Sequence, residues 1–172
     1  MSKHRILYFQ DNIQITLEER NNKVRGKFRH LARQVSREVF DVPEENLILF
    51  AYEKQTHVGQ MSFSLPDMSL TDPGVTFDSE YYPQISFMFV LKDFQSMGFG
   101  RLMLNQALKM IAEVCSMRPV RLQSAIDAVP FFQKCGFQIV SQPIQCFHSG
   151  SRLFKTLVNM ELEIQSTKGD NT

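Results

Sequence analysis

The sequence predicts a single α/β domain in which helices flank one mixed, mostly antiparallel sheet. Short apolar runs typical of strands recur along the chain, and segments whose apolar residues are spaced by three and four lie between them. One such helical segment joins two apolar runs, and strands joined by a helix run parallel with a right-handed crossover. The chain has 172 residues, which is enough for one domain with a single core.

The composition is that of a globular protein and argues against several functional classes. Hydrophobic residues make up 43% and charged residues 22%, and the net charge is +1, so we do not expect a nucleic-acid binder. The cysteines, Cys115, Cys135 and Cys146, lack the paired spacing of a metal site, and we expect no bound metal. There is no signal-peptide core and no apolar run approaching the roughly 18 residues of a membrane span. These features predict a reduced, cytoplasmic protein without membrane partners.

The first elements follow from local patterns. Ile6–Phe9 and Ile13–Leu17 are candidate strands separated by a turn-forming Asp-Asn pair. From Asn21 to Phe40 the apolar residues follow the helical period. A solvated face explains the basic residues of this helix better than a nucleic-acid site, although some of them could meet substrate. These basic residues are Lys23, Arg25, Lys27, Arg29, Arg33 and Arg37.

A hairpin and a long loop follow the break at Pro43–Asn46. Leu47–Tyr52 and Gly59–Leu65 flank a short turn and carry apolar residues, which predicts paired antiparallel strands. Pro66–Pro83 is polar and irregular, and a loop of this length in a compact domain is often functional. Two interpretations stay open for this loop: a lid over an acceptor site and a plain surface excursion.

The second half of the chain supplies the crossover and the last strands. An apolar run, a helical segment and a second apolar run follow one another, so the helix should connect two parallel strands. A short helix then ends at Gly136, a natural C-terminal cap. The domain is expected to occupy residues 1–165, with a polar tail over 166–172. The predicted elements are the strand Ile85–Leu91, the helix Leu102–Cys115, the strand Val120–Ala125, the helix Ala128–Cys135, the strand Phe137–Val140, a loop over Pro143–Ser151 and the strand Phe154–Ile164.

The stretch Gln95–Arg101 lies where the central apolar run meets the long helix. The first turn of a helix has unpaired N–H groups and the positive end of the helix dipole. Gly98 and Gly100 would let a ligand approach this backbone closely, so the stretch predicts a phosphate site. A mononucleotide P-loop is excluded because its Lys-Ser/Thr pair is missing, and a dinucleotide loop is disfavoured because Met103 stands where a small residue is needed.

Two stretches resemble signatures of the GNAT superfamily of N-acetyltransferases. The order Gln-x-x-Gly-x-Gly, from Gln95 to Gly100 after Phe-Met-Phe-Val, resembles the loop that binds the pyrophosphate of acyl-CoA. Residues Ala128–Phe137 resemble the second signature, a short helix closing on Gly-Phe. The resemblance implies acetyl-CoA as co-substrate. It also implies two adjacent parallel strands that splay apart to hold pantetheine in the gap.

The resemblance also implies which residues bind and react. The N–H of Val90 would meet the oxyanion, while Glu80 and Gln84 lie near the early strand positions where relatives often carry a glutamate base. Many relatives place a proton-donating tyrosine where this chain has Phe132. The implied acetyl-CoA-binding residues are Met88, Phe89, Val90, Gln95, Ser96, Met97, Gly98, Phe99, Gly100, Arg101 and Phe132.

Acid–base chemistry indicates which proton transfer needs more help from the enzyme, deprotonation of the amine or protonation of the leaving thiolate. An alkylamine has a pKa of about 10.4, so presenting it unprotonated at neutral pH costs about 4–5 kcal/mol. A thiol leaving group with a pKa of roughly 8.5 requires only about 2 kcal/mol of help. We therefore expect the missing tyrosine to slow the reaction rather than to abolish it.

The predicted function is acetyl transfer from acetyl-CoA to a primary amine by direct attack in a ternary complex. A small-molecule amine is favoured slightly over a protein. A protein substrate would require an open groove, and a small amine a closed pocket. The alternative is a non-catalytic GNAT domain that binds acyl-CoA or a protein partner, which Phe132 would favour. A homodimer through exposed strand edges is a further expectation.

Overall fold

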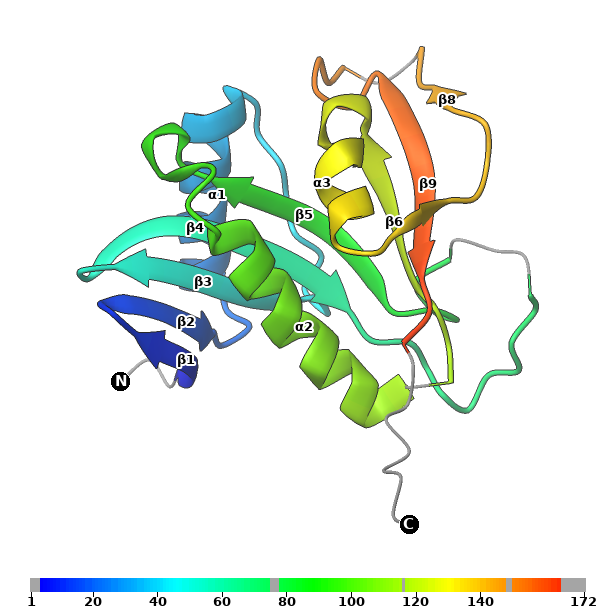
Figure 1. Cartoon of the computed structure of the whole chain (residues 1–172), viewed down its shortest axis with the longest axis horizontal. Coiled ribbons are helices and arrows are strands. Elements are labelled where there is room, and N and C mark those ends of the chain that lie inside the picture. The colour runs from blue at the N-terminus through cyan, green and yellow to red at the C-terminus, as the bar shows by residue number, and fades with distance from the viewer. Residues whose placement is uncertain (1–3, 75–77, 116, 148–149, 165–172) are drawn as a thin grey trace.

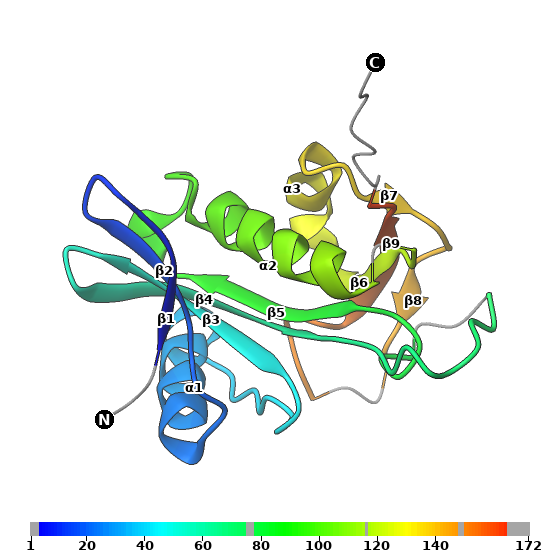
Figure 2. The same cartoon turned by 90° about the horizontal axis from the view of Figure 1, so that it is seen from below.

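The computed structural model describes residues 4–74, 78–115, 117–147 and 150–164; the predicted tail lies outside them. One sheet of nine strands has the order β1-β2-β3-β4-β5-β6-β9-β7, with β8 pairing to β9. Helix α1 covers one face of the sheet, and α2 and α3 cover the other (Figures 1 and 2). The elements are β1 Arg5–Gln10, β2 Ile13–Leu17, α1 Asn22–Ser36, β3 Leu47–Glu53, β4 Thr56–Ser64, β5 Gln84–Val90, α2 Phe99–Cys115, β6 Val120–Ala125, α3 Val129–Lys134, β7 Gln138–Ile139, β8 Ile144–Gln145 and β9 Thr156–Leu162.

The predicted sheet and its crossover are confirmed. The pairs from β1 to β5 are antiparallel, and β5 and β6, which α2 connects, are parallel. β5 and β6 pair only at Gln84 with Arg121 and at Ile85 with Leu122. Beyond these two pairs the strands diverge, as Figure 1 shows, and the sheet has a gap at its centre.

Helix α1 is shorter than its apolar pattern predicted. The side chain of Asn21 accepts a hydrogen bond from the N–H of Val24 at 2.9 Å, which caps the first turn. The helix ends at Ser36 rather than at Phe40, because Arg37 adopts a left-handed conformation with φ 61°. Phe40 therefore lies beyond the helix, where its ring packs at 5.2 Å from the ring of Phe154, centroid to centroid.

The last part of the chain differs from the prediction in a short additional strand and in the length of the final strand. The predicted loop Pro143–Ser151 contains the short strand β8, which pairs with the first residues of β9. A strand of two residues has no periodicity that the sequence could reveal. The strand predicted over Phe154–Ile164 is confined to Thr156–Leu162, which leaves Phe154 in the preceding connection.

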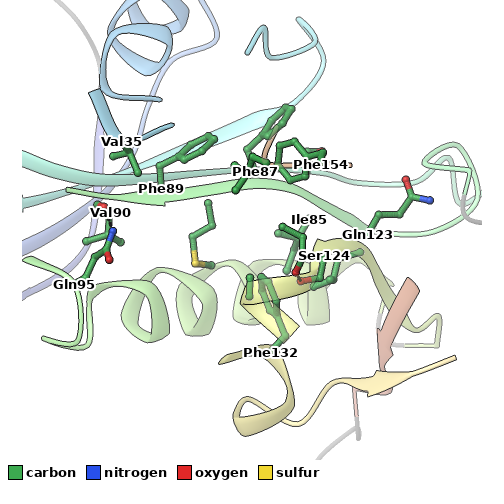
Figure 3. A pocket seen from close by; sticks show the side chains of 16 residues that line it. Val35, Ile85, Phe87, Phe89, Val90, Gln95, Gln123, Ser124, Phe132 and Phe154 are labelled. Atoms are coloured by element: carbon green, nitrogen blue, oxygen red, sulfur yellow. Dashed lines mark hydrogen bonds between the residues drawn. The ribbon is translucent and has the colours of Figure 1, made fainter. Parts of the chain in front are cut away.

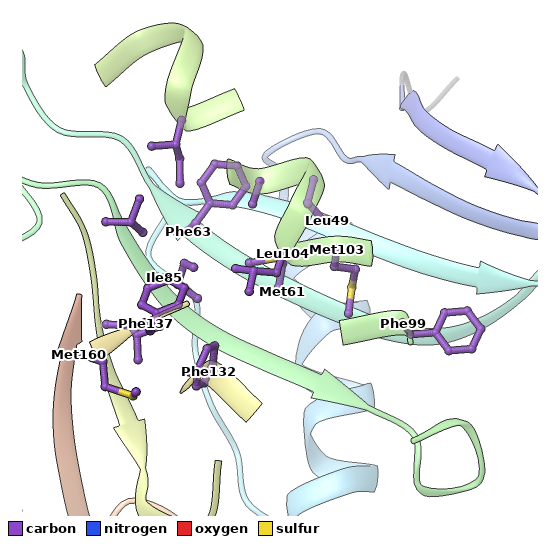
Figure 4. Packing of buried hydrophobic residues seen from close by; sticks show 14 of the residues in the cluster. Leu49, Met61, Phe63, Ile85, Phe99, Met103, Leu104, Phe132, Phe137 and Met160 are labelled. Atoms are coloured by element: carbon purple, nitrogen blue, oxygen red, sulfur yellow. The ribbon is translucent and has the colours of Figure 1, made fainter. Parts of the chain in front are cut away.

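Two apolar clusters hold the sheet between its helices. The cluster under α1 includes Phe28 and Phe50, both without exposed surface. The larger cluster, under α2 and α3, continues across β6 and β9 (Figure 4). Burial of such side chains contributes about 1.5–3 kcal/mol each. Labelled members in Figure 4 are Leu49, Met61, Phe63, Ile85, Phe99, Met103, Leu104, Phe132, Phe137 and Met160.

The long loop before β5 is tied to the body of the domain. Arg118, which is buried, donates to the carbonyl oxygens of Tyr81 at 2.8 Å and Leu70 at 2.5 Å. The guanidinium of Arg121 lies 3.7 Å from the ring centroid of Tyr82, whose hydroxyl bonds to Asp72. These contacts favour the interpretation of the loop as a fixed surface excursion over that of a moving lid.

Part of the basic face of α1 is engaged by other residues of the chain. Arg29 pairs with Asp41 at 3.1 Å, and the ammonium of Lys27 lies 5.1 Å from the ring centroid of Phe50. These contacts agree with the interpretation of a solvated face whose positive charges are partly paired within the chain. Among the described residues no helix is long and apolar enough to cross a membrane, and none of their acidic, histidine and cysteine side chains form a metal-binding group.

Candidate active site

The gap between β5 and β6 opens into a cavity of about 200 Å³, here called the gap pocket. Val35, Phe87 and Phe154 line it on the α1 face of the sheet, and Ala128 and Phe132 line it on the opposite face. Figure 3 shows the Phe87 and Phe154 rings on one side of β5 and the Phe132 ring on the other. The gap pocket thus connects the two faces of the sheet at the place where strand pairing stops.

A larger pocket of about 600 Å³, the loop pocket, lies where β5 ends and α2 begins. All of the predicted acetyl-CoA-binding residues except Phe89 and Met97 line it. Phe89 is buried beneath α1, although it also borders the gap pocket, while the Met97 residue is 55% exposed. Residues that the prediction missed also line the loop pocket: Phe94, Ala128, Phe131 and Lys134.

The start of α2 gives the loop pocket the character of an anion site. The N–H of Leu102 donates to the carbonyl of Gly98 at 3.0 Å. The N–H groups earlier in this first turn have no partner within the helix, and the helix dipole favours negative charge there. Arg101 and Lys134 add two cationic side chains to the lining. This donor set fits a phosphate-bearing ligand.

The two loop glycines are required for different reasons. Gly98 has φ +90°, and a Cβ built there would have no atom within 4 Å, so the backbone faces open space. A Cβ at Gly100 would lie 3.2 Å from both the Met88 sulfur and the Phe131 ring. Gly98 therefore leaves room for a ligand, while Gly100 allows α2 to pack closely against β5 and α3.

Strand β5 directs backbone groups into the gap. Leu91 donates its N–H to the carbonyl of Val58 on β4 at 2.8 Å. Because successive residues of a strand alternate the edge to which their N–H and C=O point, Val90 presents both groups to the opposite edge. The side-chain amide of Gln95 donates to this Val90 carbonyl at 3.0 Å. The Val90 N–H thus faces the gap, as a donor to an oxyanion there would require.

Comparisons with known proteins agree with this geometry. A family model described as acetyltransferase (GNAT) domain matches residues 16–163, which is most of the chain. The chain belongs to the GNAT acetyltransferase family. None of the curated protein sequences matches this GNAT enzyme significantly.

Solved structures with low sequence identity share the fold of this acetyltransferase. Arabidopsis thaliana Naa50, in complex with the bisubstrate analogue CoA-Ac-MVNAL, is 19% identical with a TM-score of 0.65, covering 86% of this chain and 97% of that one. The ribosomal-protein-S18-alanine N-acetyltransferase of Escherichia coli is 15% identical, also with a TM-score of 0.65, covering 93% and 98%. A putative N-acetyltransferase from Lactobacillus plantarum is 14% identical with a TM-score of 0.67, covering 89% and 99%.

The predicted bases of this GNAT acetyltransferase occupy different surroundings. Gln84 lines a third pocket of about 200 Å³, the acceptor-side pocket, on the α1 face of β5. Glu80 is exposed, and its backbone N–H binds the side chain of Asp78 at 2.9 Å. It lines neither the acceptor-side pocket nor the gap pocket. Its role as a base stays a prediction without support from position.

No charged or histidine side chain is among the described residues that line the gap pocket and the acceptor-side pocket. His57 lines neither of these pockets and packs against the Phe50 ring, at 4.2 Å between centroids. Burial lowers the pKa of His57 to about 4, so this side chain is neutral at physiological pH. Phe132 is only 7% exposed and places its ring in both the gap pocket and the loop pocket.

A hydrogen-bonded bridge lies next in sequence to Leu153 and Phe154, which line the gap pocket. The carboxylate of Glu38 accepts hydrogen bonds from the Ser151 hydroxyl at 2.6 Å and from the Arg152 N–H at 2.5 Å. The Ser151 hydrogen bond is the main cause that lowers the pKa of Glu38 below its usual range, so the bridge is ionised at neutral pH. The Glu38 bridge joins the connection after α1 to the connection before β9.

The sequence did not reveal the residues that line the α1 face of the gap pocket. Val35 was predicted as one more apolar residue of a helix, and Phe154 as part of the last strand. Leu153 and Phe154 enter the gap pocket because the chain before β9 folds back toward α1. No local pattern marks such a contact between segments that are more than one hundred residues apart in sequence.

Proposed function

We propose that this acetyltransferase transfers the acetyl group of acetyl-CoA to a primary amine by direct attack in a ternary complex. The observation that carries the proposal is the gap pocket, which reaches both faces of the sheet. A donor bound in the loop pocket and an acceptor on the α1 face would meet there without a covalent enzyme intermediate. The bisubstrate analogue named for the Arabidopsis neighbour, which links CoA to an acetylated peptide, agrees with such a meeting.

The residues of the loop pocket fit the donor. The first turn of α2, Arg101 and Lys134 would bind its phosphates, and the open space at Gly98 lets them approach the backbone. Met88 and Val90 would hold the pantetheine arm beside the free edge of β5. The thioester then reaches the gap pocket, where the Val90 N–H donates to the oxygen that becomes negative.

The chemical step balances without an acidic or basic side chain at the gap. The amine nitrogen forms a bond to the thioester carbon, the carbon–sulfur bond breaks, and sulfur keeps the electron pair. Nitrogen releases a proton to water, and the CoA thiolate takes one up from water. Because Phe132 offers no proton, sulfur leaves as the thiolate, which at pH 7 lies about 2 kcal/mol above the thiol, and the thiolate then takes its proton from water.

Calorimetric titration with acetyl-CoA, CoA and NADH is the first test. Micromolar binding of acetyl-CoA and CoA, without binding of NADH, is expected. Initial rates at varied acetyl-CoA and amine concentrations should then give intersecting double-reciprocal lines. Parallel lines would contradict direct transfer, and failure of acetyl-CoA to bind would contradict the proposed function as a whole.

The non-catalytic alternative makes a different prediction for the same protein. It predicts acetyl-CoA binding without acetylation of any amine, and Phe132 is the feature that favours it. A homodimer belongs to the proposal as well. The edge strand β1 exposes Ile6 and Phe9, and sedimentation of the purified protein checks whether two copies associate.

A further inference from the structure

We infer that the acceptor is a small monoamine with an aromatic side group. The inference rests on the proposed function and concerns its acceptor. It is carried by the size and lining of the acceptor-side pocket and by the absence of charge among its lining residues.

The acceptor-side pocket has the size of one aromatic ring with a short chain. The pocket is open to solvent on one side and has a volume of about 200 Å³, which is more than the roughly 150 Å³ of an apolar cavity that holds benzene. Ile85, Phe87, Phe154 and Leu157 form its apolar wall. The same Phe87 and Phe154 line the gap pocket, so a ring seated here has its amine side directed to the place of transfer.

Neighbouring rings support the aromatic part of this wall. The Phe154 ring lies 6.0 Å from Phe87 and 5.2 Å from Phe40, both edge to face. Phe87 in turn stacks against Phe89 at 6.1 Å. Aromatic pairs in such geometries are favoured beyond their buried area, so a substrate ring can extend an existing arrangement.

The polar residues of the pocket are all neutral. Gln84, Ser86 and Gln123 are its polar lining, and no charged side chain is among its lining residues. A polyamine would place a second ammonium against this wall without a carboxylate partner, which costs free energy. A monoamine has no second charge.

Desolvation also lowers the pKa of the ammonium group of the bound amine, which supplies the unprotonated nucleophile where no base is present.

The test compares acceptors at the same acetyl-CoA concentration. The panel is 2-phenylethylamine, ethylamine, spermidine and a pentapeptide with a free N-terminus and one lysine, with acetylated products measured by mass spectrometry. We expect kcat/KM for 2-phenylethylamine to exceed that of each other acceptor at least tenfold. A higher value for spermidine or the peptide, or an equal value for ethylamine, would overturn the inferred acceptor class.

Two phenylalanines of the same segment provide a matched pair of variants. Phe154→Ala should raise KM for 2-phenylethylamine about tenfold while acetyl-CoA affinity stays unchanged. Phe147→Ala, at a residue that is 87% exposed, should change neither. Equal effects of the two variants would contradict the assignment. Phe154→Leu retains a large apolar side chain, so the fold should be kept. The ratio of kcat/KM for 2-phenylethylamine to kcat/KM for ethylamine should still fall in this variant.

If acetyl-CoA binds but no acceptor is acetylated, the CoA-loaded protein is titrated with 2-phenylethylamine to test whether the amine binds. If 2-phenylethylamine does not bind, the inferred acceptor class is wrong. If acetyl-CoA itself does not bind, the proposed function is wrong.

Discussion

The pockets on the two sides of the gap between β5 and β6 are built in different ways; the loop pocket is here called the donor mouth and the acceptor-side pocket the acceptor mouth. On the donor side, one contiguous stretch, Gln95–Arg101, supplies six of the thirteen lining residues, and we propose that its backbone binds the phosphates. On the acceptor side, α1, β5, β6 and the connection before β9 supply residues to the gap pocket, and β5, β6, the same connection and β9 supply residues to the acceptor-side pocket. The difference teaches that a shared donor can be held by a local backbone motif, whereas acceptor selection depends on tertiary contacts.

The mouths also differ in charge. Arg101 and Lys134 make the donor mouth cationic, which suits a polyanion. No charged side chain is found among the described residues lining the acceptor-side pocket. Substitutions that affect only one mouth therefore test whether the two act independently.

The largest effect is expected for Gly98→Glu at the donor mouth. A side chain at φ +90° costs about 1–2 kcal/mol, and the carboxylate repels the phosphates. We expect acetyl-CoA affinity to fall about a hundredfold, measured by calorimetry. Gly74→Glu is the matched control, because Gly74 has φ +86° with open space around it but lies outside the loop pocket. Equal losses of affinity in the two variants would contradict the phosphate assignment.

A smaller effect is expected when the cationic side chains of the donor mouth are removed. Arg101→Ala and Lys134→Ala should each weaken acetyl-CoA binding about three- to tenfold at low salt, and less at high salt because exposed charges are screened. Lys109→Ala, an exposed lysine further along α2, is the control and should leave the affinity unchanged. A loss that does not depend on salt would argue against a direct electrostatic role.

Where the mouths meet, Phe132→Tyr should raise turnover severalfold, up to about tenfold. The added hydroxyl could donate the proton that the leaving thiolate needs, and the thiol pKa limits this help to about 2 kcal/mol. Stopped-flow release of CoA at saturating substrates measures it. Unchanged turnover would show that water already supplies the proton efficiently.

The smallest effect on catalysis is expected for His57→Gln, because His57 lines neither mouth. Its effect should appear in stability instead. The pKa of His57 is about 4 in the folded protein, against about 6.5 unfolded, so the unfolded state binds more protons as pH falls from 6.5 to 4. Wild-type unfolding free energy should fall in this range, by up to about 3 kcal/mol, and less so in the variant. Chemical denaturation at pH 7 and pH 4.5 measures it; a lowered kcat/KM would contradict the assignment.

The elements on the donor side of the molecule were predicted from the sequence, while the binding role of their residues stays a prediction. The strand, turn and helix around Gln95–Arg101 follow from apolar spacing and glycine placement, and the family model agrees with the resemblance. The fold was predicted for the same reason, because each strand and helix has its own periodicity. Even here the role of Gly100 was not evident, since its close contact with Met88 and Phe131 exists only after α2 packs against β5 and α3.

The acceptor side was not predictable in this way. Phe40 was assigned to a helix that in fact ends at Ser36, and Phe154 to a strand that begins at Thr156. Both rings contact each other only because those two elements stop early. Glu38 had no recognisable motif, although its carboxylate joins segments from opposite ends of the chain.

By itself the sequence determined the mixed sheet, the crossover and the glycine-containing turn at the start of α2, because these features depend on residues close together in the chain. Only the tertiary structure decided where β5 and β6 separate, which rings line the α1 face and how the Glu38 bridge joins two distant connections beside it. The physical reason is that strand divergence and cavity shape result from packing between distant segments, which local periodicity does not encode.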